Sequence, residues 1–199
     1  MWPVWPRPFT PLAEWARHHS CYLICPIHIC KGERCDNAAM LIDRQGQVMG
    51  EYRKRHPIES EMAEGVWPGP AEPPVFETDF GRIGIQVCCA IHYEAPWRRL
   101  GELGAELVFW PTAFAGGQLL NARARENYYS VVSSTNKDAV RICDLTGDEL
   151  CHSGRWQSGR LSAPVNLERA ALRPWPYVRH FPAMQAKYGR RLRLQTLHE

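Results

Sequence analysis

Apolar and polar positions follow both helical and strand periods along the chain. Helical spacing over residues 11–20 puts Leu12, Trp15 and Ala16 on one side of a short helix. The same spacing recurs in two later segments, residues 94–105 and 116–129. Gly104 lies near the end of the first of these segments and predicts where that helix stops.

Strand signals alternate with the predicted helices. Residues 21–29 form an apolar run, and three hairpins are indicated by turn residues at Asp43–Gly46, Asp79–Gly81 and Asp144–Gly147. Two continuously apolar or β-branched runs, residues 105–111 and 128–135, predict buried strands. This interleaving places the chain in the α/β class and predicts a large mixed sheet.

Composition narrows the class of protein. The chain has 199 residues, of which 45% are hydrophobic and 23% charged, as in one globular domain. A formal charge of +3 is too small to indicate a nucleic-acid partner. No apolar run approaches the length of a membrane span, and the opening residues do not resemble a secretory signal. We therefore expect a cytoplasmic protein.

Eight cysteines raise the questions of disulfides and of metal binding. Their spacing is not that of a small secreted disulfide framework, so reduced thiols are expected. Several potential zinc ligands crowd together in one segment: Cys21, Cys25, His28, Cys30 and Cys35. Because alternate residues of this segment also form one apolar strand face, buried small hydrophobic residues are favoured over a zinc-stabilised interaction module.

Two adjacent cysteines stand where an apolar strand ends. In residues 83–88 the side chains alternate, which predicts that Cys88 points away from the core face and that Cys89 packs inward as a structural thiol. Carboxyl ends of strands in α/β sheets are where ligands bind. The backbone N–H groups of the turn that follows are then free to meet a developing oxyanion.

A second strand end carries a basic residue in a similar position. Tyr52, Lys54 and His56 share one face of their strand. A lysine beside Cys88 would favour the thiolate because the two charges are opposite. From spacing alone, a solvated basic patch is the alternative interpretation of this segment.

Four segments in order resemble the nitrilase superfamily of carbon–nitrogen hydrolases. They are NAAMLIDRQGQVMGEYRKRH, FGRIGIQVCC, GAELVFWPTAF and RARENYYSVVSSTN. The resemblance implies an α-β-β-α four-layer sandwich over residues 11–167, incomplete at its N-terminus. Residues 1–10 are then an irregular, Pro- and Trp-rich start, and residues 168–199 a C-terminal arm.

The resemblance also implies roles for particular residues. It implies that Cys88 is the nucleophile of a Glu-Lys-Cys triad and that Lys54 stabilises the oxyanion. The backbone amide of Cys89 is the second oxyanion donor. An auxiliary glutamate falls on Glu61, with Glu59 as the competing alignment, and a surface acid without a role is the alternative for both.

The implied reaction is hydrolysis of a linear amide or N-carbamoyl compound through a cysteine thioester. It needs no metal and no organic cofactor. A nitrile is less favoured, because true nitrilases resemble Cys-Trp-Glu at the nucleophile, where this chain has Cys88, Cys89 and Ala90. His92 and Thr112 are predicted to line the substrate pocket, although an ordinary loop histidine explains His92 equally well.

The chain also departs from the family pattern. Residues 1–10 contain no Glu or Asp that could serve as the family's general base, and Ala90 replaces an aspartate found in many relatives. We therefore expect a truncated and slow hydrolase, since losing a general base typically costs about 10²–10⁴ in rate. The alternative is a non-catalytic binding or assembly subunit. In either case the family pattern implies a homodimer or larger homo-oligomer.

Overall fold

The computed structural model describes residues 9–32, 34–135, 139–154, 160–172 and 174–195. The chain divides into a larger unit, Met1–Arg169, and a smaller one, Ala170–Glu199. Among the described helices, none combines the length and the apolar character needed to cross a membrane.

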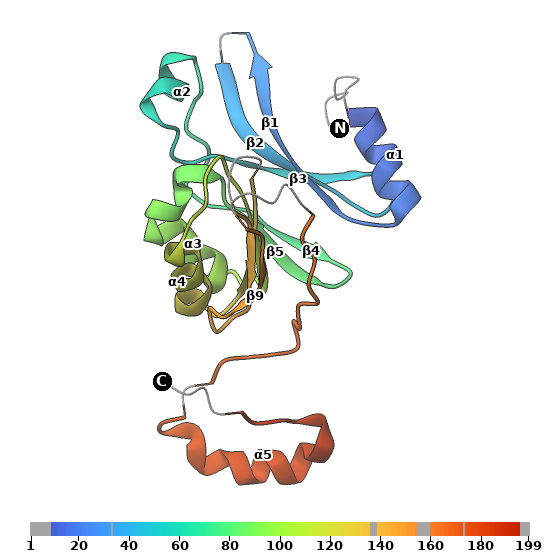
Figure 1. Ribbon diagram of the computed structural model, residues 1–199, viewed down its shortest axis with the longest axis vertical. Coiled ribbons are helices and arrows are strands. Elements are labelled where there is room, and N and C mark those ends of the chain that lie inside the picture. The colour runs from blue at the N-terminus through green and yellow to red at the C-terminus, as the bar shows by residue number, and fades with distance from the viewer. Residues whose placement is uncertain (1–8, 33, 136–138, 155–159, 173, 196–199) are drawn as a thin grey trace. The chain divides into compact units, whose positions relative to one another are not determined.

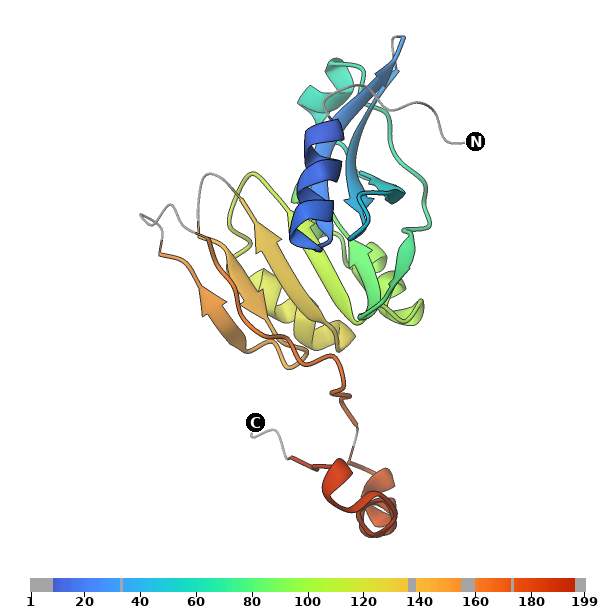
Figure 2. The same cartoon turned by 90° about the vertical axis from the view of Figure 1, so that its right-hand side faces the viewer.

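A three-stranded antiparallel sheet opens the larger unit. It follows helix α1 (Phe9–His19) and has the order β1-β2-β3, with bounds Leu23–Lys31, Arg34–Ile42 and Val48–Arg53. Figure 2 shows α1 lying alongside this sheet. The Arg17 guanidinium donates to the Gln45 carbonyl in the β2–β3 turn over 3.1 Å, which anchors the helix to the sheet.

The second sheet has six strands in chain order, β4 to β9. Their bounds are Val75–Thr78, Gly81–Ile85, Leu107–Pro111, Ser130–Ser134, Arg141–Cys143 and Glu149–His152. The three strands β5, β6 and β7 are parallel, and antiparallel partners flank them on both sides. Helices α3 (Glu94–Glu102) and α4 (Gln118–Asn127) connect the parallel strands. The predicted mixed sheet is therefore confirmed.

Two apolar interfaces hold these elements in layers. Trp97 and Leu100 of α3 and Leu120 of α4 pack on Val108 and Val131 of the six-stranded sheet. Between the two sheets, a second cluster joins buried residues of β2, β5 and β6, namely Leu41, Ile83 and Leu107. The order of layers is thus helix, sheet, sheet and helix pair, which confirms the predicted sandwich (Figure 1).

Two of the predicted turns form through the same arrangement of residues, an aspartate followed three residues later by a glycine. Asp43 and Asp144 each close a turn in which the aspartate carboxylate accepts a backbone N–H two residues later, from Gln45 and Thr146. The turn glycines have φ angles of +74° at Gly46 and +83° at Gly147, a region that residues with a β-carbon rarely adopt. Both turns join antiparallel strands, β2 to β3 and β8 to β9.

One hairpin and one disulfide were not predicted. β2 begins at Arg34 and pairs with β1 along its whole length, so that Cys30 lies opposite Cys35. The two sulfur atoms are bonded at 2.01 Å. The expectation of reduced thiols is therefore wrong for this pair, because cross-strand register brings together two cysteines that the sequence separates by a polar turn. The other six cysteines are free.

Two features near the ends of the chain differ from the sequence-based expectation. α1 already begins at Phe9, within the start that was predicted to be irregular, while residues 1–8 lie outside the described ranges. Of the residues predicted to share one side of this helix, Ala16 is buried and Trp15 is 51% exposed. The C-terminal arm, for which no helix was predicted, contains helix α5 (Phe181–Tyr188).

Replacing Trp97 by alanine should lower the free energy of unfolding by about 3–5 kcal/mol. The ring is fully buried, and its indole N–H donates to the Ala90 carbonyl over 2.8 Å. The matched change Trp15→Ala should stay within about 0.5 kcal/mol, since that ring is exposed. Urea unfolding of the two variants measures both values, and equal losses would refute the assigned layers.

Candidate active site

Lys54 is a buried cation at the carboxyl end of β3. Its side chain is 1% exposed, which rules out the interpretation of this residue as part of a solvated basic patch. The backbone fixes its position: the Lys54 N–H donates to the Asn37 carbonyl over 2.8 Å, and its carbonyl accepts from Gly69 over 2.9 Å. A buried ammonium needs a counter-charge and hydrogen-bond acceptors to remain ionised.

Glu61 supplies the counter-charge from the short helix α2 (Glu59–Ala63). The Lys54 ammonium lies 2.9 Å from Oε1 and 2.7 Å from Oε2 of its carboxylate. Two further donors contact the same carboxylate, the Asn37 side-chain amide and the Ile58 backbone N–H, each over 2.7 Å. The competing residue Glu59 is exposed at the start of α2, so Glu61 is the glutamate that meets the lysine.

The carboxylate of Glu61 is stabilised in its ionised form. Burial on its own would raise its pKa, but the hydrogen bonds from Lys54, Ile58 and Asn37 and the charge of Lys54 hold the pKa below its ordinary value. Glu61 therefore stays charged at neutral pH and keeps Lys54 paired.

Cys88 lies at a sharp turn between a strand and a helix. β5 ends at Ile85, and the 3₁₀ helix η1 runs from Cys88 to His92 before α3 begins. The φ angle of Cys88 is +51°, in the left-handed region that is rare for any residue but glycine. Such strained turns expose a nucleophile at the end of a sheet in other hydrolases, where they present the side chain to substrate.

This turn overturns the predicted orientation of Cys88. Cys88 is half-buried and packs against the cluster of Ile85 and Val87, the face from which strand alternation was expected to direct it away. The alternation fails because β5 stops at Ile85 and the positive φ angle of Cys88 redirects the chain. The Cys88 carbonyl accepts a hydrogen bond from the Trp110 indole over 2.8 Å, which holds the turn to β6.

Cys89, expected to be a structural thiol, has its sulfur beside Lys54. The thiol donates to the His56 carbonyl over 3.0 Å. Burial raises the pKa of this thiol, while the charge of Lys54 and a side-chain hydrogen bond with it act in the opposite direction. The strand end that carries Lys54 and the turn that carries Cys88 and Cys89 therefore meet at one place.

A buried polar pair joins β3 to the residue that follows β5, close to Lys54 and Cys88 in the sequence. Tyr52, two residues before Lys54, donates its hydroxyl proton to Oε1 of Gln86 over 3.0 Å. Both residues are almost completely buried, and burial strongly raises the pKa of Tyr52, so the phenol stays neutral. Sequence reasoning did not identify this pair, because strand alternation placed Gln86 on the opposite face from the core.

The two residues predicted to line the pocket are joined to each other through Phe114. The His92 ring stacks on the Phe114 ring with 6.0 Å between centroids. The Thr112 hydroxyl accepts the Phe114 backbone N–H over 3.3 Å. His92 is the last residue of η1 and Thr112 directly follows β6, and a pocket role for the two residues stays a prediction.

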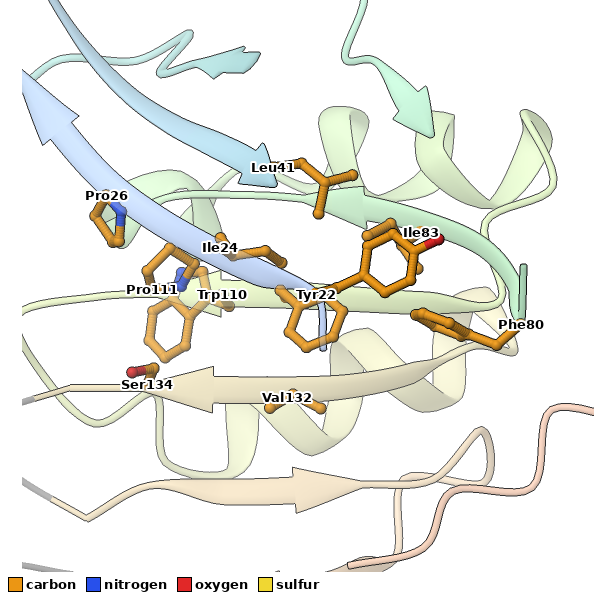
Figure 3. Close-up of a pocket in the computed structure, with 11 residues that line it drawn as sticks. Tyr22, Ile24, Pro26, Leu41, Phe80, Ile83, Trp110, Pro111, Val132 and Ser134 are labelled. Carbon is orange, nitrogen blue, oxygen red and sulfur yellow. The ribbon is translucent and has the colours of Figure 1, made fainter. Parts of the chain in front are cut away.

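An apolar cavity of about 190 Å³ lies between the two sheets (Figure 3). Ile24 from β1, Leu41 from β2 and Val132 from β7 line it, and Trp110 closes it near the carboxyl end of β6. Lys54, Glu61, Cys88 and Cys89 are not among the residues that line this cavity. Its link to them is Trp110, which also bonds the Cys88 carbonyl.

The alternative of a zinc module loses two of its five potential ligands. Cys30 and Cys35 are joined in a disulfide, and a disulfide sulfur is not a thiolate ligand. Within the described ranges, no three His, Cys, Asp or Glu side chains come close enough together to hold a metal ion.

Comparison with known proteins identifies the family of the chain. A family model described as carbon-nitrogen hydrolase matches residues 8–176. The chain therefore belongs to the carbon-nitrogen hydrolase family. The match includes both strand ends, the turn at Cys88 and helix α2.

Individual relatives are similar over parts of their length. A β-ureidopropionase of Arabidopsis thaliana is 35% identical over 111 residues, covering 53% of this chain and 27% of the plant protein. A deaminated glutathione amidase of a Synechocystis strain is 33% identical over 113 residues, covering 49% of this chain and 42% of that protein. The chain thus spans less than half the length of these two curated relatives.

Solved structures show the same fold. The crystal structure of an amidase from Nesterenkonia sp. superposes with a TM-score of 0.68 and 26% identity, covering 74% of this chain and 62% of the amidase. The fold predicted from the sequence, an α/β sandwich of the carbon–nitrogen hydrolase type, is therefore confirmed.

Replacing Glu61 by alanine should lower the free energy of unfolding by about 3–5 kcal/mol, because it leaves the Lys54 ammonium buried without its partner. Glu59→Ala is the matched control on the same helix. It should change stability by about 0.5 kcal/mol or less, since Glu59 is exposed. If urea denaturation gave the same midpoint for both variants, the importance of the pair would be refuted.

The ion pair should also make stability depend on pH in the acid range. Because the Glu61 pKa is lower in the folded protein than its ordinary value of 4.5, the stability from its ionised form is complete above that value. It is lost as the pH falls through the folded-state pKa. The difference in unfolding free energy between the wild type and Glu61→Gln should therefore shrink below pH 4.5, and a constant difference from neutral pH downward would contradict the assignment.

Proposed function

We propose that this chain is a carbon–nitrogen hydrolase that accepts the acyl group of a linear amide or N-carbamoyl compound on Cys88. The observation that carries the proposal is the meeting of the buried Lys54–Glu61 pair with the strained turn at Cys88 and Cys89. Membership of the family supports the reaction class. The names of the two relatives, a ureidopropionase and an amidase, support the substrate class.

Each residue has a defined task in this reaction. The Cys88 sulfur attacks the carbonyl carbon, a carbon–sulfur bond forms, and the carbonyl electrons move onto oxygen. Lys54 and the backbone N–H of Cys89 stabilise that oxyanion. The carbon–nitrogen bond then breaks, the amine leaves with the thiol proton, and water hydrolyses the thioester to the acid and the free thiol. Glu61 serves as the auxiliary glutamate that keeps Lys54 charged and in place.

The second step is proposed to be the slow one. Both carboxylate oxygens of Glu61 already accept hydrogen bonds, from Lys54, Asn37 and the Ile58 N–H. A carboxylate that is held in this way is a poor base for activating water. We therefore infer that acylation of Cys88 outpaces hydrolysis of the thioester, so that the acyl-enzyme accumulates.

A non-catalytic binding subunit is the second proposal. The burial of Ala90, where many relatives have an aspartate, favours it, because a methyl group there can neither move a proton nor accept one. Such a protein would bind an amide at the same place without forming a covalent bond.

We also propose that the protein forms a homo-oligomer, which the family resemblance supports, and that it is cytoplasmic, which the composition supports.

Incubation with p-nitrophenyl acetate, an activated ester, tests the proposal. Intact-mass and peptide mass spectrometry should find one acetyl group on Cys88. The thioester should hydrolyse about 10²–10⁴ times more slowly than in an enzyme whose general base is in place. Cys88→Ser should abolish the adduct, and Cys89→Ser should keep it, because only the backbone of Cys89 has a task. Lys54→Met should slow acylation without moving the modified position.

Two outcomes would overturn the proposal. Acetylation of Cys89 with Cys88 unmodified would exchange the roles of the two thiols. No adduct on either thiol, together with a raised melting temperature in the presence of acetamide, would favour the binding subunit over the hydrolase.

A further inference from the structure

Asn37 on β2 contacts both members of the buried ion pair. Its side-chain amide donates to Oε1 of Glu61 over 2.7 Å. Its backbone carbonyl accepts the N–H of Lys54 over 2.8 Å. One residue of the middle strand therefore connects a cation on β3 with a carboxylate on α2, and the steps proposed above give it no task.

The position of Glu61 depends on such outside contacts. α2 has only five residues, and none of them is buried, so apolar packing of its own side chains does not fix it. The same stretch of β2 holds the chain just after α2: the Cys35 N–H donates to the Gly65 carbonyl, and the Cys35 carbonyl accepts from Trp67, each over 2.9 Å. Within the described part of the chain, β2 thus fixes α2 by its backbone and Glu61 by the Asn37 amide.

The amide acts directly on the charge of Glu61. Three groups donate hydrogen bonds to this carboxylate: the Lys54 ammonium from β3, the Asn37 amide from β2 and the Ile58 N–H that precedes α2. The Cys89 thiol from η1 interacts with its charge without bonding it. The amide is the neutral side-chain donor of this set, and its bond favours the ionised carboxylate. Without it, Oε1 accepts from Lys54 alone, and the carboxylate is held against the lysine only by Lys54 itself and by the Ile58 N–H on Oε2.

We propose that Asn37 is a positioning residue that fixes the Glu61 carboxylate against Lys54 and so aims the Lys54 ammonium at the turn of Cys88 and Cys89. The benefit to acylation of Cys88 rests on the function proposed above. The effect on Glu61 does not rest on it, because that effect depends only on the hydrogen bond.

The test compares Asn37→Ala with a matched control, Asn127→Ala. The Asn127 amide also donates a 2.7 Å hydrogen bond, to the Arg123 carbonyl on α4, far along the chain from Glu61. Carboxyl ¹³C NMR titration follows the ionisation of Glu61, whose signal is assigned by its loss in Glu61→Gln. Asn37→Ala should raise the Glu61 midpoint by about one to two pH units, the size of a lost hydrogen bond to a charged group, and Asn127→Ala should leave it unchanged.

A second variant guards against misfolding. Asn37→Asp keeps the shape of the side chain but puts a like charge beside Glu61, and it should raise the Glu61 midpoint further than Asn37→Ala does. If both Asn37 variants left the midpoint at the wild-type value, the positioning role would be overturned, whatever their stability.

Acylation by p-nitrophenyl acetate at pH 7.5 gives the second measurement. Asn37→Ala should acylate Cys88 about tenfold more slowly than the wild type, with Asn127→Ala unchanged. If the wild type forms no adduct, the proposed function fails, while the NMR titration still decides the role of Asn37. If the midpoint moves and the acylation rate of Asn37→Ala does not, Asn37 fixes Glu61 without aiming Lys54, and the second half of the proposal is overturned.

Discussion

The buried ion pair between Lys54 and Glu61 is the interaction on which the rest of the site depends. An ammonium that is 1% exposed is tolerated only where a carboxylate and good hydrogen-bond geometry offset its loss of water. The pair joins the end of β3 to the short helix α2, and Asn37 of the neighbouring strand β2 contacts both of its members. It also leaves a fixed positive charge beside the Cys89 thiol, at the turn that begins with Cys88, where a negative charge would develop in an acyl transfer.

The sandwich supplies the frame for this arrangement. Parallel strands β5, β6 and β7, covered by α3 and α4, hold the turn at Cys88 from one side, and the Trp110 indole bonds its carbonyl. The three-stranded sheet carries Lys54 from the other side, and the Tyr52–Gln86 hydrogen bond ties the two strand ends together. Strain at one residue can persist because its surroundings are rigid.

Much of the fold could be predicted from the sequence because its signals are local. Apolar periods and Asp-to-Gly turns depend on residues a few positions apart, and they located helices α3 and α4 and the hairpin turns at Asp43 and Asp144. The Cys30–Cys35 disulfide depends on the register between β1 and β2, which the sequence pattern did not reveal. The Asn37–Glu61 hydrogen bond joins residues 24 positions apart, a contact that no local pattern predicts. The predicted orientation of Cys88 was wrong for a related reason. Side chains alternate only within a strand, and β5 ends at Ile85, before the positive φ angle of Cys88 turns the chain.

A crystal structure of the chain acetylated on Cys88 tests the central claim most directly. The account predicts that the acyl oxygen lies about 3 Å from both the Lys54 ammonium and the backbone nitrogen of Cys89, with Glu61 still bound to Lys54. An acyl oxygen that points away from Lys54, toward solvent or into the apolar cavity between the sheets, would contradict it.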